Sequence, residues 1–131
     1  MDLSSTWSGE VVLELFTPSG DSVGLIKRLG TVDDDDCGIS GFFTAGNKLT
    51  FNSANETRLA SPYPTGNYKP SSGTSTFPTS VAMTPLATFL KDKSIKGAWK
   101  IKIYDYGTLA ANLSTTKLNS WKLKFDTGAL E

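Results

Sequence analysis

The fold of this chain is decided by Ala98-Trp99-Lys100-Ile101-Lys102-Ile103-Tyr104, in which large apolar side chains alternate with lysines. A second stretch with the same period is Trp121-Lys122-Leu123-Lys124-Phe125. A period of two places successive side chains on opposite faces of a strand, so each stretch predicts a strand with one buried face and one face in water. We therefore expect Trp99 and Trp121 to lie in the core rather than to form an aromatic platform for a sugar.

The same pattern extends toward the N-terminus. Residues 11–17 (VVLELFT) predict a strand, Pro18-Ser19-Gly20-Asp21 is typical of a tight turn, and residues 22–27 predict the returning strand of a hairpin. A shorter strand is expected at residues 48–51. These short strands, joined by turn-rich segments, predict an all-β chain folded as a jelly-roll-like antiparallel β-sandwich, with residues 1–131 in one domain.

Only one stretch has a helical pattern. Residues 84–90 (TPLATFL) combine helical apolar spacing with Thr84 as a candidate N-cap and Pro85 as a first-turn residue. One short turn of helix is expected there. The stretch from residue 60 to residue 85 is rich in Gly, Pro, Ser and Thr and predicts connecting loops.

Composition narrows the classes of function. The 13 basic and 13 acidic side chains balance, so charge gives no reason to expect nucleic acid or a membrane surface as a partner. No apolar run approaches the roughly 20 residues that span a bilayer. The chain contains no histidine, which removes the usual general base and the Ser-His-Asp and Cys-His nucleophile systems. We therefore expect a domain that is not an enzyme by itself.

The single cysteine, Cys37, excludes an intrachain disulfide. Without a histidine to activate its thiol, it is interpreted as a small apolar filler. Two triplets satisfy the N-glycosylation sequon, Asn55-Glu56-Thr57 and Asn112-Leu113-Ser114. They matter only if the chain comes from a eukaryotic secretory protein.

Asp33-Asp34-Asp35-Asp36 is the densest charge feature of the sequence. Carboxylates in a flexible loop can wrap Ca²⁺, which takes six to eight oxygen ligands and tolerates irregular geometry. The spacing is not that of an EF-hand loop, and contiguous aspartates on a strand would point to alternate sides. Two interpretations stay open: a solvated acidic loop, or a calcium site to which Asp21 and Asp105 are weaker contributors.

Five lysines accompany the two alternating stretches, and they would form one basic stripe if the two strands shared a sheet. They are interpreted first as solubilising outer-face residues that guard against edge pairing. Docking onto an acidic surface, such as that of a partner protease, is the alternative. The five are Lys96, Lys100, Lys102, Lys122 and Lys124.

Three parts of the chain carry a family resemblance. The first is residues 6–20 (TWSGEVVLELFTPSG), the second is residues 63–70 (YPTGNYKP) with residues 85–89 (PLATF), and the third is residues 96–105 (KGAWKIKIYD) with residues 118–125 (LNSWKLKF). In order and spacing these resemble the P domain that accompanies subtilisin-like proprotein convertases. The resemblance covers about residues 6–125.

The resemblance implies an eight-stranded jelly-roll sandwich lying C-terminal to a subtilisin-type catalytic domain, as in kexin, furin and many bacterial secreted proteases. It implies a non-catalytic accessory domain that supports folding and stability of the catalytic domain and modulates its calcium or pH dependence. The catalytic domain in the same polypeptide is then the expected partner, the expected location is extracellular, and the isolated domain is expected to be a monomer. The alternative is a free-standing carbohydrate- or protein-binding jelly-roll module, which predicts exposed aromatic side chains around one concave site.

The sequence departs from the family pattern at several positions. Glu10 stands where Asp is usual, Asn52-Ser53 replaces a common acidic pair, and Thr116-Lys117 replaces Gly-Thr. The acidic changes weaken the case for a metal site. Family members also carry one or two strands before the first strand recognised here, so those strands are either missing from this sequence or absent from the protein. Leu130-Glu131 is interpreted as a cloning scar.

Overall fold

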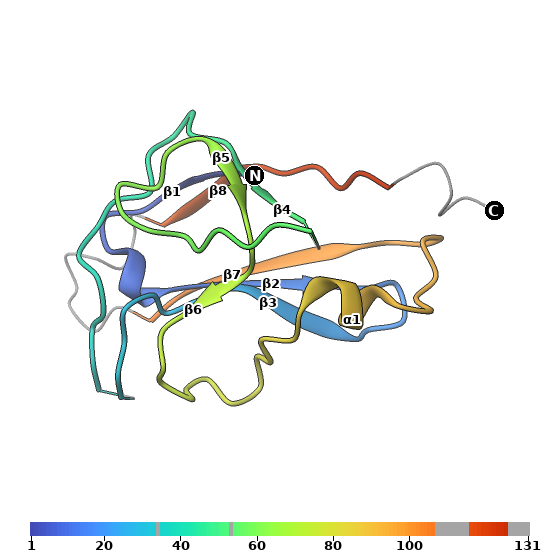
Figure 1. Cartoon of the computed structure of the whole chain (residues 1–131), viewed down its shortest axis with the longest axis horizontal. Coiled ribbons are helices and arrows are strands. Elements are labelled where there is room, and N and C mark those ends of the chain that lie inside the picture. The colour runs from blue at the N-terminus through green and yellow to red at the C-terminus, as the bar shows by residue number, and fades with distance from the viewer. Residues whose placement is uncertain (34, 53, 107–115, 126–131) are drawn as a thin grey trace.

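The computed structural model describes residues 1–33, 35–52, 54–106 and 116–125 (Figure 1). Strands make up most of the regular secondary structure of these residues and helix is almost absent, which confirms the all-β prediction. None of the described helices is long and apolar enough to cross a bilayer. The elements are β1 (Asp2–Ser4), the 3-10 turn η1 (Ser8–Glu10), β2 (Val11–Phe16), β3 (Ser22–Lys27), β4 (Leu49–Phe51), β5 (Gly66–Tyr68), β6 (Ser71–Ser72), α1 (Leu86–Leu90), β7 (Lys100–Asp105) and β8 (Lys117–Ser120).

The predicted hairpin is confirmed as β2 and β3. The backbone N–H of Gly20 donates to the carbonyl of Thr17 at 3.0 Å, which closes the turn with Pro18 in its second position. Gly20 has a φ of 97°, a conformation that glycine adopts without a steric penalty. The turn residues therefore specify the turn that the sequence predicted.

The hairpin forms the centre of a four-stranded sheet in the order β6-β3-β2-β7. β7 pairs antiparallel with β2 along its whole length, from Val11 opposite Asp105 to Phe16 opposite Lys100. β6 pairs with β3 in the parallel direction over two residues. The strand expected at residues 98–104 is therefore confirmed, displaced by one or two residues.

A second layer is built from two short strand pairs. β1 pairs antiparallel with β8, and β4 pairs parallel with β5. An antiparallel bridge between Asp2 and Lys48 joins the pairs, and the backbones of Met1 and Leu49 exchange hydrogen bonds at 2.8 and 2.9 Å. Figure 1 shows this layer facing the layer of β2, β3, β6 and β7. The parallel pairings depart from the antiparallel prediction, and the jelly-roll order stays a prediction.

Apolar side chains fill the space between the layers. Leu13 and Ile26 of the hairpin and Leu49 of β4 are almost completely buried. Phe43 and Tyr63 stack with 4.4 Å between ring centroids, and the Tyr63 hydroxyl is 2.7 Å from the Ser8 hydroxyl oxygen, so the buried phenol has a hydrogen-bonding group.

Two sequence predictions need correction. α1 begins at Leu86, and its N-cap residue is Pro85, which has no side-chain hydrogen-bonding group and so provides no side-chain cap. Thr84, the predicted cap, lies one residue before it. Residues 121–125 are not a strand: β8 ends at Ser120. In the β1–β8 register Asp2 lies opposite Ser120, and the next residue, Met1, already exchanges backbone hydrogen bonds with Leu49.

Candidate functional site

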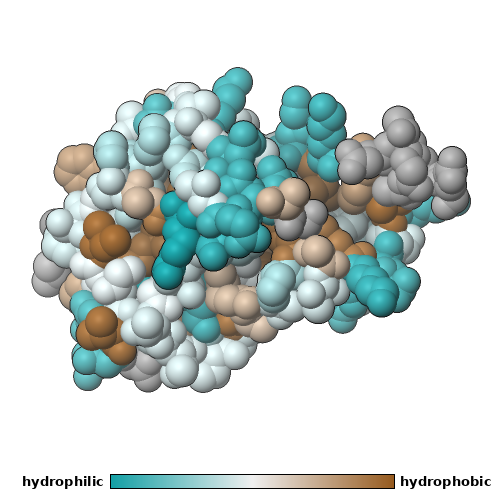
Figure 2. All heavy atoms as spheres, viewed as in Figure 1, coloured by the Kyte–Doolittle hydropathy of each residue, from teal (hydrophilic) through white to brown (hydrophobic). Residues whose placement is uncertain are grey.

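A groove of about 930 Å³ opens between the two layers at the end where the chain leaves β8. Leu15 and Leu25 of the hairpin line it from one layer, and Leu49 and Phe51 of β4 line it from the other. Figure 2 shows apolar surface toward the centre and right of the view, flanked by hydrophilic side chains above and below. The core of the sandwich is therefore accessible from solvent on this side.

Aromatic side chains line the mouth of this groove. The Trp99 ring lies 5.5 Å from the Phe125 ring at an interplanar angle of 55°, and its indole N–H donates to the Ile95 carbonyl at 3.2 Å. Trp99 is partly buried against the core, as its position in the alternation predicts. Trp121 also lines the groove but is 36% exposed, so the prediction that it is a core residue is wrong. It is exposed because its segment does not join the sheet.

The rim of the groove is mainly cationic. Lys48, Lys122 and Lys124 are exposed lining residues. Asp2 is the one carboxylate among the described lining residues, and it accepts the backbone N–H of Gly46 at 3.1 Å and the side-chain amide of Asn119 at 3.2 Å. These hydrogen bonds, with the Gly46 bond first, lower the pKa of Asp2. A ligand that fits the groove is therefore apolar with negative charge at its edge.

The lysines do not form the single stripe that a common sheet would produce. Lys100 and Lys102 belong to β7 in the four-stranded sheet, whereas Lys122 and Lys124 follow β8 outside any strand. All four are exposed, as is Lys96, in agreement with the outer-face interpretation. The pair after β8 reaches the groove and the pair on β7 does not.

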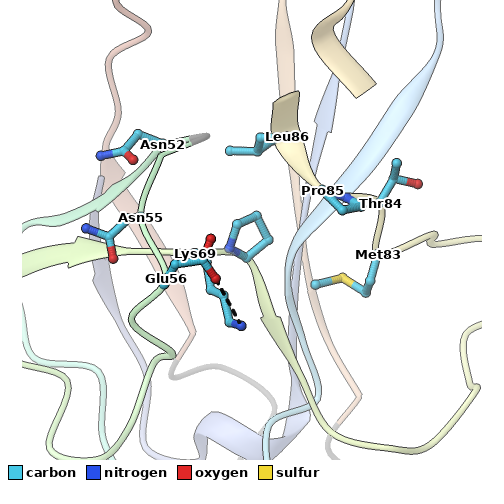
Figure 3. Close-up of a pocket in the computed structure, with 9 residues that line it drawn as sticks. Asn52, Asn55, Glu56, Lys69, Met83, Thr84, Pro85 and Leu86 are labelled. Atoms are coloured by element: carbon cyan, nitrogen blue, oxygen red, sulfur yellow. Dashed lines mark ion pairs between the residues drawn. The ribbon is translucent and has the colours of Figure 1, made fainter. Parts of the chain in front are cut away.

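A smaller pocket of about 270 Å³ adjoins the groove, and Asn52 and Leu86 line both. Figure 3 shows Asn52 and Asn55 on one side of it and Met83 and Leu86 on the other. An ion pair between Lys69 and Glu56, 4.0 Å long and solvent-exposed, lies at this pocket (Figure 3). The described sequon residue Asn55 therefore lines a hollow, while the sequon at 112–114 lies outside the described residues.

Three of the six calcium candidates lie in one loop. The two carboxylate oxygens of Asp36 accept backbone N–H groups from Val32 and Gly38, each at 2.9 Å, and these bonds lower the Asp36 pKa. Asp33 accepts the backbone N–H of Asp35 at 3.1 Å. Asp36 therefore shapes its own loop, and Asp34 lies outside the described residues.

The other two candidates lie at opposite ends of β2. Asp21 lies in the β2–β3 turn, where it accepts a hydrogen bond from Lys93 at 2.8 Å. Asp105 lies opposite Val11, at the other end of β2. No group of three or more His, Cys, Asp or Glu side chains placed to hold a metal occurs within the described ranges. Calcium binding at Asp33–Asp36 stays a prediction.

Cys37 directly follows the loop of Asp33–Asp36. The indole N–H of Trp7 donates to the Cys37 carbonyl at 2.8 Å, which holds the loop against the start of η1. The Cys37 side chain is exposed, so its interpretation as a buried filler is wrong. The reason is that the residue lies on a surface loop and not on a strand facing the core.

Two buried glutamates at the start of the hairpin were not predicted. Glu14 is buried and accepts the Tyr104 hydroxyl at 3.0 Å; burial first, then Glu14, raises the pKa of Tyr104 to about 12. Glu10 is also buried, and burial, together with the nearby Asp105, raises its pKa. Glu14 belongs to β2, whereas Glu10 ends η1 directly before it.

No family model, curated protein or solved structure matches this chain. The P-domain resemblance therefore depends on the residues quoted for it. Of those, the hairpin and β7 occupy the places that an alternating pattern requires, while the last part of residues 118–125 leaves the sheet. The groove that results is the candidate site with the clearest geometry.

Proposed function

We propose that this chain is a non-catalytic docking domain with a jelly-roll-like sandwich fold, which supports a subtilisin-like serine endopeptidase domain in the same secreted polypeptide. The observation that carries the proposal is the groove between the layers, with its apolar lining and the exposed Trp121 at its mouth. Its connection to a protease rests on the P-domain resemblance.

An apolar groove of this kind favours association. Burying a large apolar side chain that is otherwise exposed stabilises an assembly by roughly 1.5–3 kcal/mol. A partner that binds only the folded domain also stabilises it, by mass action, and an accessory domain can stabilise a catalytic domain in the same way. Contiguous apolar surface that remains open on a folded domain is typical of an interaction site.

The lining favours a protein partner over a carbohydrate. A sugar site needs several polar groups that converge on the ring hydroxyls beside an aromatic platform. Here the two Trp residues are accompanied mainly by aliphatic side chains such as Leu86, Leu90 and Ile95. Aliphatic walls fit an apolar polypeptide surface better than a sugar, so the carbohydrate-binding module is the weaker alternative.

The proposal is tested in the native polypeptide that contains these residues. We expect Trp121→Ala to lower the melting temperature and the yield of the catalytic domain, because it removes apolar contact area at the docking groove. Phe42→Ala is the matched control, since Phe42 is 62% exposed and does not line the groove. A catalytic domain that is equally stable with the chain deleted, or a native gene without a subtilisin-type domain, would show that the proposed function is wrong.

A further inference from the structure

We infer that the groove takes an extended acidic segment of the partner, which adds as a β-strand alongside residues 121–125. This inference deepens the proposed function and rests on it, because it specifies the chemistry of what docks in the same groove. Three features carry it: the backbone after β8, which has no hydrogen bond among the described residues, the apolar lining of the groove, and the charge of the rim.

The backbone of residues 121–125 takes part in no hydrogen bond in the part of the chain that the structure describes. It runs on directly from β8, which is paired with β1 (Figure 1). Met1, which precedes β1 and would continue the pairing, has its amino and carbonyl groups bonded to Leu49. A backbone segment that continues a strand and lacks a partner is a template for an added strand from another polypeptide.

The side chains of this segment indicate the pattern of the added strand. Trp121, Leu123 and Phe125 alternate with two lysines, and the whole segment lines the groove. A paired strand places its side chains beside these, so apolar residues would meet the aromatic ones and acidic residues would meet the lysines. The fitting partner segment therefore alternates apolar and acidic residues.

The rim charges favour acidic over basic residues. Lys48 directly precedes β4, and Lys122 and Lys124 follow β8, so both strand pairs of this layer contribute cationic side chains to the rim. Asp2 is already held by Gly46 and Asn119 and is engaged within the fold. Cross-strand pairs of opposite charge stabilise a sheet, and like charges directly opposite destabilise it.

A polypeptide fits this site better than a hydrocarbon chain. A fatty acid could match the apolar lining and place its carboxylate at the lysines. It would cover the backbone N–H and C=O groups of residues 121–125 without offering them hydrogen-bond partners, which is unfavourable. An added strand satisfies these groups and fills the groove at the same time.

The test uses the full 131-residue chain and labelled peptides of about ten residues, the upper length of common strands. We expect a peptide alternating Val and Glu to bind at least about tenfold more tightly than one alternating Val and Lys, equivalent to about 1.4 kcal/mol. Lys122→Glu with Lys124→Glu should reverse that preference. The matched control, Lys100→Glu with Lys102→Glu, has the same spacing on β7 outside the groove and should leave it unchanged.

Backbone pairing is tested separately by N-methylation of both the Val and the Glu residues of the Val/Glu peptide, which blocks both edges of the strand. We expect this change to abolish binding, because it removes the N–H groups that an added strand donates. Binding that survives N-methylation, or a charge reversal that leaves the preference unchanged, overturns the inference. If Trp121→Ala still weakens the native polypeptide in that case, the docking function stands without the acidic strand.

Two other outcomes also decide the question. Saturable binding of dodecanoate by the chain, with neither peptide bound, assigns the groove to a fatty-acid-like ligand and overturns the inference. If neither peptide nor dodecanoate binds, and Trp121→Ala leaves the native polypeptide unchanged, both the inference and the proposed function are wrong. Folding of each variant is checked by its circular dichroism spectrum before binding is compared.

Discussion

Residues 98–105 and residues 117–125 carry nearly the same alternation of apolar side chains and lysines, yet they fold differently. The first becomes β7 and pairs over six residues with β2. The second becomes β8 only as far as Ser120, and its most apolar part leaves the sheet. Alternation thus specifies which side chains share a face, but a strand forms only where a backbone partner is within reach.

The length of the partner strand explains the difference. β2 continues for six residues beside β7, whereas β1 has three residues to offer to β8. The consequence reaches the side chains: Trp99 packs against the core, and Trp121 is 36% exposed at the groove. The Trp99 indole therefore contributes to core packing, whereas the Trp121 indole is available for binding.

The largest expected difference between the two segments lies in the core that β7 covers. Leu13 is fully buried and lies opposite Ile103, so Leu13→Ala should lower the free energy of unfolding by about 2–5 kcal/mol. Leu123→Ala, in the segment after β8, should cost less than about 1 kcal/mol, since that side chain lines an open groove. Urea unfolding followed by fluorescence measures both. Equal losses would show that the two segments are equally part of the core.

One proline substitution in each segment tests whether its backbone takes part in strand pairing. The Tyr106 N–H donates to the Glu10 carbonyl at 2.8 Å, and alternate residues of an antiparallel ladder repeat that direction, so the Lys102 N–H faces β2. Lys102→Pro should therefore cost roughly 1–3 kcal/mol through a lost bond and an unsatisfied carbonyl.

Lys124→Pro is the matched substitution, because Lys124 is also an exposed lysine of an alternating stretch. Its backbone has no hydrogen bond to lose within the described residues, and its unfolding free energy should stay within about 0.5 kcal/mol of wild type. A large loss from Lys124→Pro would mean that residues 121–125 pair with another part of the chain.

The smallest expected effect concerns Glu10, which directly precedes β2 and lies near Asp105 at the end of β7. Burial raises the pKa of Glu10, and Asp105 beside it acts in the same direction. The folded state therefore holds this proton more tightly than the unfolded chain, so the contribution of Glu10 to stability falls as the pH rises from about 4.5 through the raised pKa. Above that pH range, the ionised Glu10 side chain lowers the free energy of unfolding.

Glu10→Gln should remove this loss and raise the free energy of unfolding near neutral pH by on the order of 1 kcal/mol or less. Unfolding measured from pH 4 to pH 8 checks the sign. A variant that is less stable than wild type at pH 7, with an unchanged pH profile, would show that the Glu10 carboxylate is stabilised by its surroundings in the folded state.

The candidate site was only partly accessible from the sequence. The lysines at 122 and 124 were recognised as a possible docking surface, because alternation exposes them in any extended conformation. Lys48 and the aliphatic lining were missed, since they come from segments far apart in the chain. Grouping the aspartates by residue type gave no information on their positions: Asp21 lies in the β2–β3 turn and Asp105 at the other end of β2, and calcium binding at Asp33–Asp36 stays a prediction.

The all-β class, the turn at Pro18 and Gly20, the β2–β3 hairpin and the alternating faces of β7 could be predicted from local sequence, because each depends on local backbone preferences and on neighbouring side chains. Which strands pair could be learned only from the fold, as could the parallel direction of two pairings among the described strands and the position of residues 121–125 outside the sheet beside an open groove. Pairing depends on which backbone groups remain available once the chain has folded, and the amino and carbonyl groups of Met1 are hydrogen-bonded to Leu49.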